Sequence, residues 1–371
     1  MMAKQWYEVD NIDEVDTPAL VIYPGRVKEN IRLLLSMIDD VNRLRPHVKT
    51  HKTREAAEMM MDAGIKKFKC TTIAEAEMLA MVNAPDVLLA YQPVAAKLKR
   101  FIALIKKYST TNFSCLVDNI PAAENISKQA IDNNITIPVY IDLNIGMNRT
   151  GISPGKEAIE LYRTCMALKG INPVGLHAYD GHIHEKDFEL RKQECDKIFE
   201  QVESLQKNLE AEGFTKLIIV AGGSPTFPIH ARRKDIECSP GTFIFWDRGY
   251  SVLLEEQPFL PAALVIARII SMPDKNKICI DLGHKSISSE NELNKRVWFI
   301  NAPELKFVSH SEEHLVAETP EDHTYKIGDI LYGMPVHVCP TCALYERALT
   351  VEENKVSGEW RIIARDRKIN I

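Results

Sequence analysis

The chain has 371 residues, and 46 Lys and Arg against 51 Asp and Glu give a net charge of −5 with histidine neutral. Apolar residues make up 45% and charged residues 26%, which excludes an intrinsically disordered chain, and only 17 Gly exclude a collagen-like one. The small negative charge argues against non-specific binding of nucleic acid, which needs a basic surface. The length favours two domains, although one α/β barrel can use about 250 residues.

Neither a membrane span nor an export signal is predicted. The longest apolar stretch, Phe259–Met272, contains Arg268 and is too short to cross a bilayer. The first residues lack the apolar region of a signal peptide. The eight Cys are scattered, and in a long chain without an export signal they favour a reducing compartment. We therefore expect a cytoplasmic protein with no membrane partner.

Runs typical of β-strands alternate with amphipathic stretches along the first two thirds of the chain. The β-like runs are Arg45–Lys49, Phe68–Thr72, Val87–Tyr91, Ser114–Val117, Pro138–Leu143, Pro173–Tyr179, Leu217–Ala221 and Thr242–Trp246. The expected helices are 27–38, Thr53–Ala63, Ala74–Val82, Ala95–Tyr108, Ala122–Asn133, Lys156–Leu168 and Lys186–Glu212. Eight β runs separated by helices predict a (β/α)8 TIM-type barrel, and a doubly wound open sheet is the alternative.

The pattern changes after about residue 247, where β-like runs follow one another with little helix. These runs are Ala262–Ser271, Lys277–Asp281, Arg296–Asn301, Leu305–Ser309, His314–Ala317, Ile330–Tyr332, Ala343–Val351 and Arg361–Ala364. They predict a separate, mainly antiparallel β domain. We expect an N-terminal segment (1–24) that joins the β domain, a barrel (25–247) and a C-terminal β domain (248–371); the alternative for the β run Thr17–Tyr23 is a cap on the barrel.

Reactive residues at the predicted strand ends are the first candidates for a site, because α/β barrels place their active sites at the carboxyl ends of the strands. Lys49 ends the first run; a desolvated amine there suits Schiff-base chemistry, and a solvated surface lysine is the alternative. Arg149 follows the fifth run and could equally be a surface salt-bridge partner. Gly222-Gly223-Ser224 follows the seventh run and is either a phosphate cradle or a plain turn.

Two further groups contain residues that bind metals. His177 lies near the end of the sixth run and His182 and His184 follow it, and the three suit a metal site, a proton relay or a polar loop. His337 and Cys339 are two residues apart, so an extended strand would point them to one face. Thiolate and imidazole together favour zinc, and a buried cysteine beside a hydrogen-bonded histidine is the alternative.

Several motifs along the chain are similar to those of one enzyme family. They are Arg45-Pro46-His47-Val48-Lys49-Thr50-His51, Gly146-Met147-Asn148-Arg149-Thr150-Gly151, Gly222-Gly223-Ser224-Pro225-Thr226 and His337-Val338-Cys339. In these motifs the chain resembles the D-threonine aldolase and D-serine dehydratase family, and the resemblance covers nearly the whole chain. These are fold-type III pyridoxal-phosphate enzymes with an alanine racemase-like N-terminal barrel.

The resemblance implies a role for each of these motifs. Lys49 would form the Schiff base with pyridoxal 5′-phosphate, and Arg149 would approach the phenolic oxygen of the cofactor. His177 and Tyr179 would lie near the pyridine ring. The residues implied to hold the phosphate are Gly222, Gly223, Ser224 and Thr226. His337 and Cys339 would hold a divalent metal, zinc before manganese, and the family is usually homodimeric.

The resemblance also implies the chemistry, a lyase that cleaves the Cα–Cβ bond of D-3-hydroxy amino acids to glycine and an aldehyde. His182 and His184 are the candidates for the general base. Dehydration to a 2-oxo acid and ammonia is the alternative, since the family's dehydratases carry His-x-Cys and its aldolases His-x-Asp, whereas the 177–181 segment resembles the aldolases. An amino-acid racemase is a further alternative. A non-catalytic pyridoxal-phosphate carrier would lack the second domain.

Overall fold

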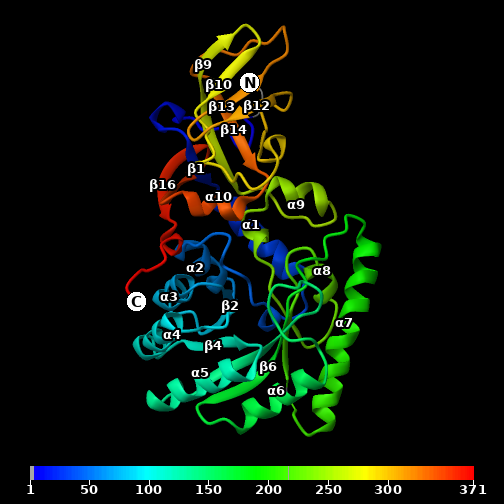
Figure 1. Ribbon diagram of the computed structural model, residues 1–371. Helices are drawn as coiled ribbons and strands as arrows, with labels where there is room; N and C mark the ends of the chain where they lie inside the picture. Colours follow the sequence, from blue (N-terminus) through cyan, green and yellow to red (C-terminus); the bar gives the residue numbers. More distant parts are fainter. Residues whose placement is uncertain (1–3, 216) are drawn as a thin grey trace. The chain divides into compact units, whose positions relative to one another are not determined.

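The computed structural model describes residues 4–215 and 217–371, so residues 1–3 of the predicted N-terminal segment lie outside the described residues. The chain forms two compact units (Figure 1). The barrel unit comprises Leu34–Lys49, Ala57–Gly241 and Asp366–Ile371. The sheet unit comprises the chain up to Leu33, Thr50–Ala56 and Thr242–Arg365. Within the described ranges, every helix is too short or too polar to cross a lipid bilayer.

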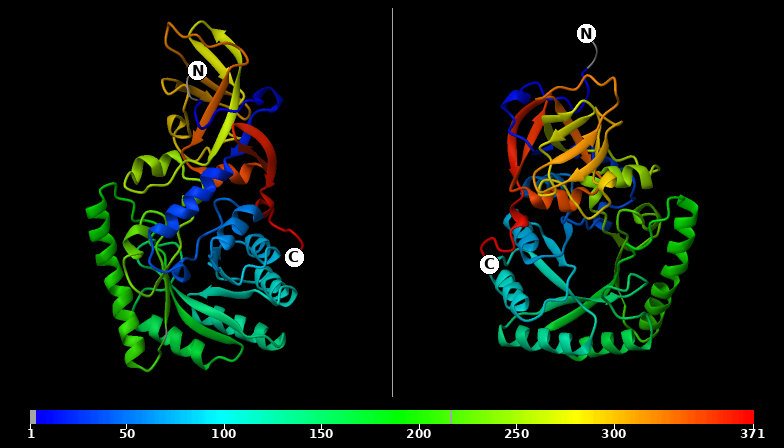
Figure 2. Two further views of the ribbon diagram at one scale, coloured as in Figure 1. Left: turned by 180° about the vertical axis from the view of Figure 1, so that it is seen from behind. Right: turned by 45° about the horizontal axis from the view of Figure 1, so that its top comes forward.

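The barrel unit contains seven parallel strands that pair in chain order. They are β2 (Lys67–Cys70), β3 (Asp86–Leu89), β4 (Asn112–Val117), β5 (Ile137–Leu143), β6 (Ile171–Ala178), β7 (Ile218–Ala221) and β8 (Ile236–Cys238). The intervening helices are α3 (Ile73–Met81), α4 (Ala96–Lys107), α5 (Ile120–Asp132), α6 (Lys156–Ala167), α7 (Phe188–Ala211) and α8 (Phe227–His230). Helices α4 to α7 lie outside the strands (Figures 1 and 2). The prediction of a parallel α/β barrel is confirmed, with seven strands in place of eight.

The segment predicted as the first strand, 45–49, contributes isolated bridges and no strand. Leu44 bridges Cys238 of β8 and His47 bridges Lys69 of β2, both in the parallel sense. Pro46 has no N–H to donate, which interrupts a continuous ladder. Its carbonyl still accepts a hydrogen bond of 2.9 Å from the Lys69 N–H. This closing segment therefore joins the first and last strands of the barrel.

The run Thr242–Trp246, predicted as the eighth strand, was assigned wrongly. It begins with the 3-10 helix η3 (Thr242–Ile244), and all five residues are buried. Aromatic and β-branched residues that are buried on every side give the same sequence pattern as a buried strand. The seventh strand of the barrel is β8, which is only three residues long and was not predicted from the sequence.

The predicted helices of the barrel unit are confirmed, with small differences at their ends. The longest, α7, ends at Ala211, and Gly213 follows with φ +91°, the left-handed conformation that commonly ends a helix. The remaining helices of the first third are α1 (Pro24–Ser36), η2 (Val41–Arg43) and α2 (Arg54–Asp62).

The sheet unit contains a nine-stranded, mainly antiparallel sheet, which confirms the predicted β domain. Its strands are β1 (Ala19–Ile22), β9 (Ala263–Asp274), β10 (Lys277–Ile280), β11 (Val297–Phe299), β12 (Lys306–His310), β13 (Leu315–Glu318), β14 (Ile330–Pro335), β15 (Arg347–Glu352) and β16 (Lys355–Arg361). Strand β1 pairs with β9 antiparallel and with β15 parallel. Shorter helices are η1 (Ile12–Glu14), α9 (Arg248–Leu253), η4 (Leu293–Lys295), α10 (Val338–Leu344) and η5 (Ile363–Arg365).

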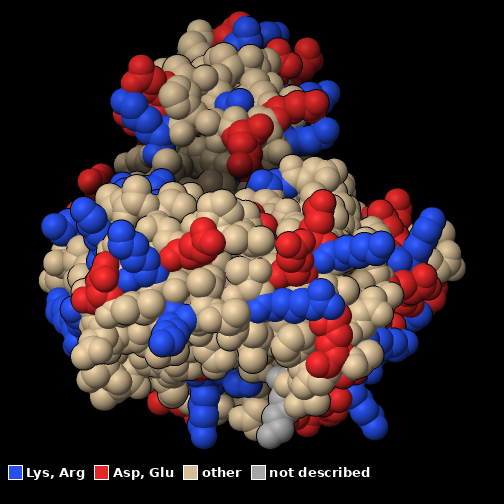
Figure 3. Space-filling view, turned by 60° about the horizontal axis from the view of Figure 1, so that its bottom comes forward, with Lys and Arg blue, Asp and Glu red and all other residues tan. Residues whose placement is uncertain are grey.

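The interior of the barrel is a packed core. Leu88, Leu116, Tyr140 and Val220, from four different strands, form one buried cluster. A filled interior confines any ligand to the mouth of the barrel. On the face shown in Figure 3, acidic and basic side chains are interspersed, so the net charge of −5 is not concentrated in one patch there.

Candidate active site

A cavity of about 730 Å³ lies in the barrel unit, at the carboxyl ends of its strands. This volume is in the range of small-molecule and cofactor sites. Four residues predicted from the sequence line it together: Lys49, Arg149, His177 and Tyr179. They come from the closing segment, the loop after β5, and β6 with the residue that follows it.

The backbone around Lys49 is held from both sides. Its own N–H donates to Nδ1 of His47 at 3.1 Å. The N–H of the preceding residue, Val48, donates to the carbonyl of Lys69 on β2 at 2.9 Å. The closing segment therefore fixes Lys49 at the wall of the cavity, with its side chain partly exposed.

Arg149 is positioned by a tight turn after β5. The side-chain Oδ1 of Asn144 accepts hydrogen bonds from the N–H groups of Gly146 (3.2 Å) and Asn148 (3.0 Å). Gly146 and Asn148 have φ of +126° and +52°, which glycine and asparagine tolerate best. The turn places the Arg149 guanidinium 5.0 Å from the ring centroid of Tyr179, within cation–π range.

Two residues that sequence reasoning missed complete this wall, Lys69 on β2 and Asp142 on β5. Asp142 Oδ1 lies 2.7 Å from His177 Nδ1, and His177 Nε2 lies 3.5 Å from Lys69 Nζ. Burial and the nearby charge of Lys49 lower the pKa of Lys69 to about 7. The sequence signal that could have located Lys69 is a lysine inside the predicted strand Phe68–Thr72.

The histidines proposed as general bases lie elsewhere. His184 is exposed, and its Nδ1 lies 2.6 Å from the carbonyl oxygen of His182. Both ring nitrogens of His182 are buried and have no hydrogen-bond partner among the described residues. Its ring packs on Gly146, where an added Cβ would stand 2.6 Å from Nε2. Neither histidine lines the cavity.

The Gly222–Thr226 loop follows β7 and contacts the cavity wall through Tyr179. A Cβ added at Gly223 would lie 3.3 Å from Cε2 of Tyr179, and Gly222 has φ +74°. Ser224 Oγ accepts a hydrogen bond from the N–H of Gly241 at 3.4 Å, and the whole loop is buried. A larger residue at Gly223 would meet Tyr179, so the close packing of the loop on the site depends on this glycine.

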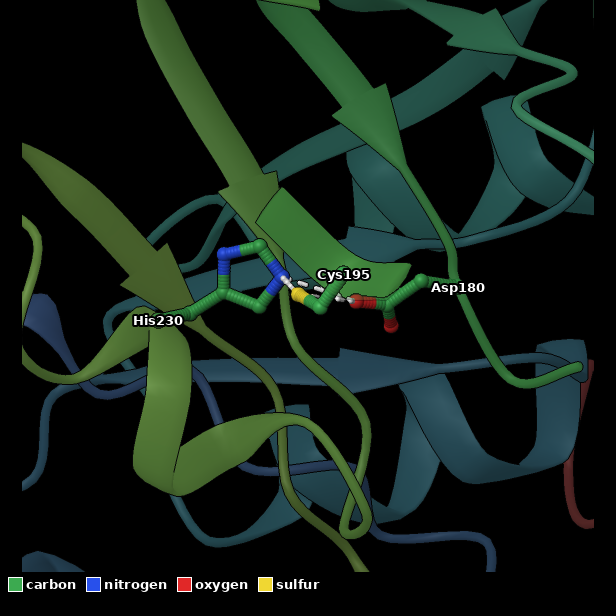
Figure 4. Close-up of side chains that lie close together, drawn as sticks. All are labelled: Asp180, Cys195 and His230. Atoms are coloured by element: carbon green, nitrogen blue, oxygen red, sulfur yellow. Dashed lines mark hydrogen bonds and ion pairs between the residues drawn. The ribbon is translucent and has the colours of Figure 1, made fainter. Parts of the chain in front are cut away.

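Asp180, Cys195 and His230 form a buried cluster behind this loop (Figure 4). Their ligand-type atoms all lie within 4.8 Å of one another, as in a metal site. However, Arg233 donates to His230 Nδ1 at 2.8 Å, so Nδ1 is the acceptor and the proton of the ring stays on Nε2. That proton points to Asp180 Oδ2 at 2.7 Å.

The cluster is therefore a hydrogen-bonded anchor for the loop. Asp180 Oδ1 accepts a hydrogen bond from the N–H of Gly223 at 3.4 Å. Although burial disfavours its charge, hydrogen bonds to His230 and its surroundings lower the pKa of Asp180. Arg233 already supplies a positive charge beside these groups.

His337 and Cys339 lie in the sheet unit at the start of a helix, and not on an extended strand as predicted. Strand β14 ends at Pro335, and His337 is the N-cap of α10. The two side chains are still neighbours. Burial opposes protonation of His337, but hydrogen bonds and charge from Cys339 and Glu290 raise its pKa to about 9.

Cys339 has two hydroxyl neighbours in the same unit. Its Sγ lies 3.1 Å from Oγ1 of Thr50 and 3.8 Å from Oγ1 of Thr242. Cys342, one helical turn further along α10, is fully buried, and burial raises its pKa well above the ordinary value. His337 and Cys339 thus offer a metal two partly exposed ligands.

An amine and a guanidinium that line one cavity at the carboxyl ends of parallel barrel strands are the arrangement of an enzyme active site. The chain belongs to the family of the alanine racemase N-terminal domain, whose model matches residues 22–248. Residues 262–351 match a second model, described as "Putative serine dehydratase domain". Enzymes of this family are fold-type III pyridoxal-phosphate enzymes.

Full-length relatives include lyases of two kinds. A D-threonine aldolase from Arthrobacter sp. is 27% identical over 96% of this chain and 94% of its own. A 3-hydroxy-D-aspartate aldolase from Paracoccus denitrificans is 24% identical over 95% and 92%. The crystal structure of a D-threonine aldolase from Filomicrobium marinum superposes with a TM-score of 0.88, at 24% identity over 98% and 99%. D-threo-3-hydroxyaspartate dehydratase from Delftia sp. superposes with a TM-score of 0.83, at 21% identity over 94% and 97%.

Proposed function

We propose that the protein is a pyridoxal-phosphate- and metal-dependent lyase that cleaves D-3-hydroxy amino acids to glycine and an aldehyde. The observation that carries this proposal is the convergence of Lys49, Arg149, His177 and Tyr179 on one cavity. Similarity to D-threonine aldolase and 3-hydroxy-D-aspartate aldolase over nearly the whole chain supports the choice of reaction.

The residues present fit the cofactor. Lys49 offers an amine for its aldehyde. The Gly222–Thr226 loop, which packs on Tyr179 of the cavity wall, would hold the phosphate through its backbone N–H groups. Arg149, held on Tyr179, would face the phenolic oxygen. When bound, pyridoxal phosphate supplies an electron sink for the bond broken at Cα.

We also propose that His337 and Cys339 bind the divalent metal. A thiolate and an imidazole favour zinc, and manganese is the second choice. A metal with two protein ligands keeps open positions, and such an ion supplies a Lewis acid for the β-oxygen of a substrate. The Delftia dehydratase has been solved as a cysteine-to-alanine variant in a metal-free form and as a histidine-to-alanine variant, which supports a search for metal at this pair.

Dehydration to a 2-oxo acid and ammonia is the second candidate, and the His-x-Cys spacing at residues 337–339 favours it. Racemisation is a third, and it gives the metal pair no role. We propose a homodimer in a reducing, cytoplasmic environment. All eight cysteines are free, which suits such an environment.

The test is product analysis by NMR with D-threonine, pyridoxal phosphate and either zinc or manganese. Glycine and acetaldehyde are expected. Ammonia and 2-oxobutyrate would assign the dehydratase instead, and L-allo-threonine the racemase. Absence of turnover with both D-threonine and 3-hydroxy-D-aspartate would contradict the proposal.

A further inference from the structure

Lys69 is a buried amine in the wall of the active-site cavity. Its side chain belongs to β2, and the residue is 3% exposed. Among the described residues it forms no ion pair with a carboxylate; its polar contact is His177 Nε2, at 3.5 Å. Its Nζ also lies 5.5 Å from the ring centroid of Tyr179. A buried lysine without a carboxylate partner is costly, and it lies where a ligand would bind.

The contacts behind Lys69 fix the direction of its hydrogen bond. Asp142 can only accept from His177, so the His177 proton is on Nδ1, which lies 2.7 Å from the carboxylate. His177 Nε2 then presents a lone pair to the Lys69 amine. Burial, opposed by Asp142, lowers the pKa of His177, which keeps the ring neutral. The chain Asp142–His177–Lys69 is thus ordered from a carboxylate to an amine at the cavity.

We propose that Lys69 is the residue that exchanges the proton of the substrate's β-hydroxyl, with His177 and Asp142 as positioning residues behind it. This role rests on the proposed lyase function and is separate from that of Lys49, which would hold the cofactor. Lys69 lines the cavity with Lys49 and Arg149, whereas His182 and His184 do not.

Protons and electrons balance in the proposed cleavage step. The neutral Lys69 amine takes the proton from the β-hydroxyl, the C–O bond becomes C=O, and the Cα–Cβ bond breaks. Its electron pair stays with Cα, and the proton held by Lys69 returns to that carbon. Glycine and an aldehyde result, and no further oxidant, reductant or base is needed.

The charges around Lys69 support a neutral amine at physiological pH. The groups that face it are Lys49 and Arg45 of the closing segment, which lower its pKa, and Asp142 and Asp180 of β5 and the β6 loop, which raise it. Its partner on β3 is Leu88, an apolar residue. Burial is the largest influence and brings the pKa to about 7. A proton carrier works best when its pKa lies near the working pH, and lysine reaches this range by burial whereas arginine does not.

The first experiment measures the Lys69 amine without catalysis. The cofactor-free protein is acetylated in competition with a free amine over a range of pH, and peptides are quantified by mass spectrometry. Lys69 should titrate near pH 7, well below the ordinary lysine value of 10.5. Titration of Lys69 at the ordinary lysine value would overturn the proposal.

The second experiment uses the loaded enzyme. In Lys69→Met, kcat for cleavage should fall by about 10²- to 10⁴-fold, the range for loss of a general base, with KM changed little. The acid limb of the kcat–pH profile near pH 7 should disappear with it. Lys66→Met is the matched control and should keep both.

The outcomes separate the two proposals. If the wild-type enzyme cleaves no D-3-hydroxy amino acid, the lyase function fails and the role of Lys69 fails with it. If the wild type is active and Lys69→Met keeps its kcat and pH profile, only the role of Lys69 is overturned. Borohydride labelling of Lys49 in Lys69→Met shows that the variant still folds and holds the cofactor.

Discussion

Individual side chains carry most of the chemistry, and Lys69 shows how much burial alone can change one of them. Its folded pKa of about 7 lies below the ordinary 10.5. Between these values the unfolded chain binds more protons than the folded one, so the free energy of unfolding rises with pH across this window. Below about pH 7 the amine is charged in both states, and its full cost of burial is felt.

Lys69→Met should therefore stabilise the cofactor-free protein, most strongly below pH 7 and progressively less toward pH 10.5. Thermal unfolding of the wild type and the variant across this range checks the expectation. Lys66→Met, at an exposed position, should shift Tm little at every pH. An increase in the stability of Lys69→Met that does not change with pH would contradict the titration assigned to Lys69.

The metal assignment also belongs to single residues. Removing one of two protein ligands should weaken metal binding at least as much as the loss of an outer-shell partner, about 10- to 100-fold. We expect purified Cys339→Ala to lose its bound zinc or manganese by elemental analysis. Cys279→Ala, a partly exposed cysteine on β10, is the control. Unchanged metal content in Cys339→Ala would remove this pair from the site.

At the scale of elements, the closing segment decides whether the barrel is complete. Arg45 is fully buried there, and its guanidinium forms ion pairs with Asp86 (2.6 Å) and Glu237 (2.7 Å) on the first and last parts of the sheet. These partners lie on β3 and β8, so Arg45 links strands on both sides of the closure.

Arg45→Met should lower the free energy of unfolding by up to about 3–5 kcal/mol, because Asp86 loses its ion pair with Arg45 and buried Glu237 keeps only Lys67. Denaturant unfolding measures this value. Arg32→Met, which removes an exposed pair with Glu29 on α1, should change stability little. A loss as small in Arg45→Met would show that the closure does not depend on this arginine.

Elements were predictable where the period of the sequence and the fold agree. The parallel strands 68–143 and the helices between them have clear periods, and they were found. The errors lie where tertiary packing decides: Pro46 interrupts the first strand, and Thr242–Trp246 is a buried turn of helix with a strand-like composition. His337 and Cys339 are neighbours as predicted, but the start of a helix brings them together, and not an extended strand.

Only part of the candidate site was predictable from the sequence. Lys49, His177 and Tyr179 lie at or near the ends of predicted strands and Arg149 follows one, so the rule for strand ends drew attention to them, and all four line the cavity. Lys69 and Asp142 lie within strands, where the sequence gives no indication of which face is turned to the mouth of the barrel. The Asp180–Cys195–His230 cluster joins three separate segments, and only the fold shows that they meet.

At the scale of the whole molecule, function depends on the binding of pyridoxal phosphate in the barrel cavity through Lys49. The direct measurement is reduction of the protein with borohydride in the presence of pyridoxal phosphate, followed by peptide mapping. We expect a pyridoxyl group on Lys49 in the wild type and its loss in Lys49→Ala. A label found on Lys69 or on surface lysines, with Lys49 unmodified in the wild type, would contradict it.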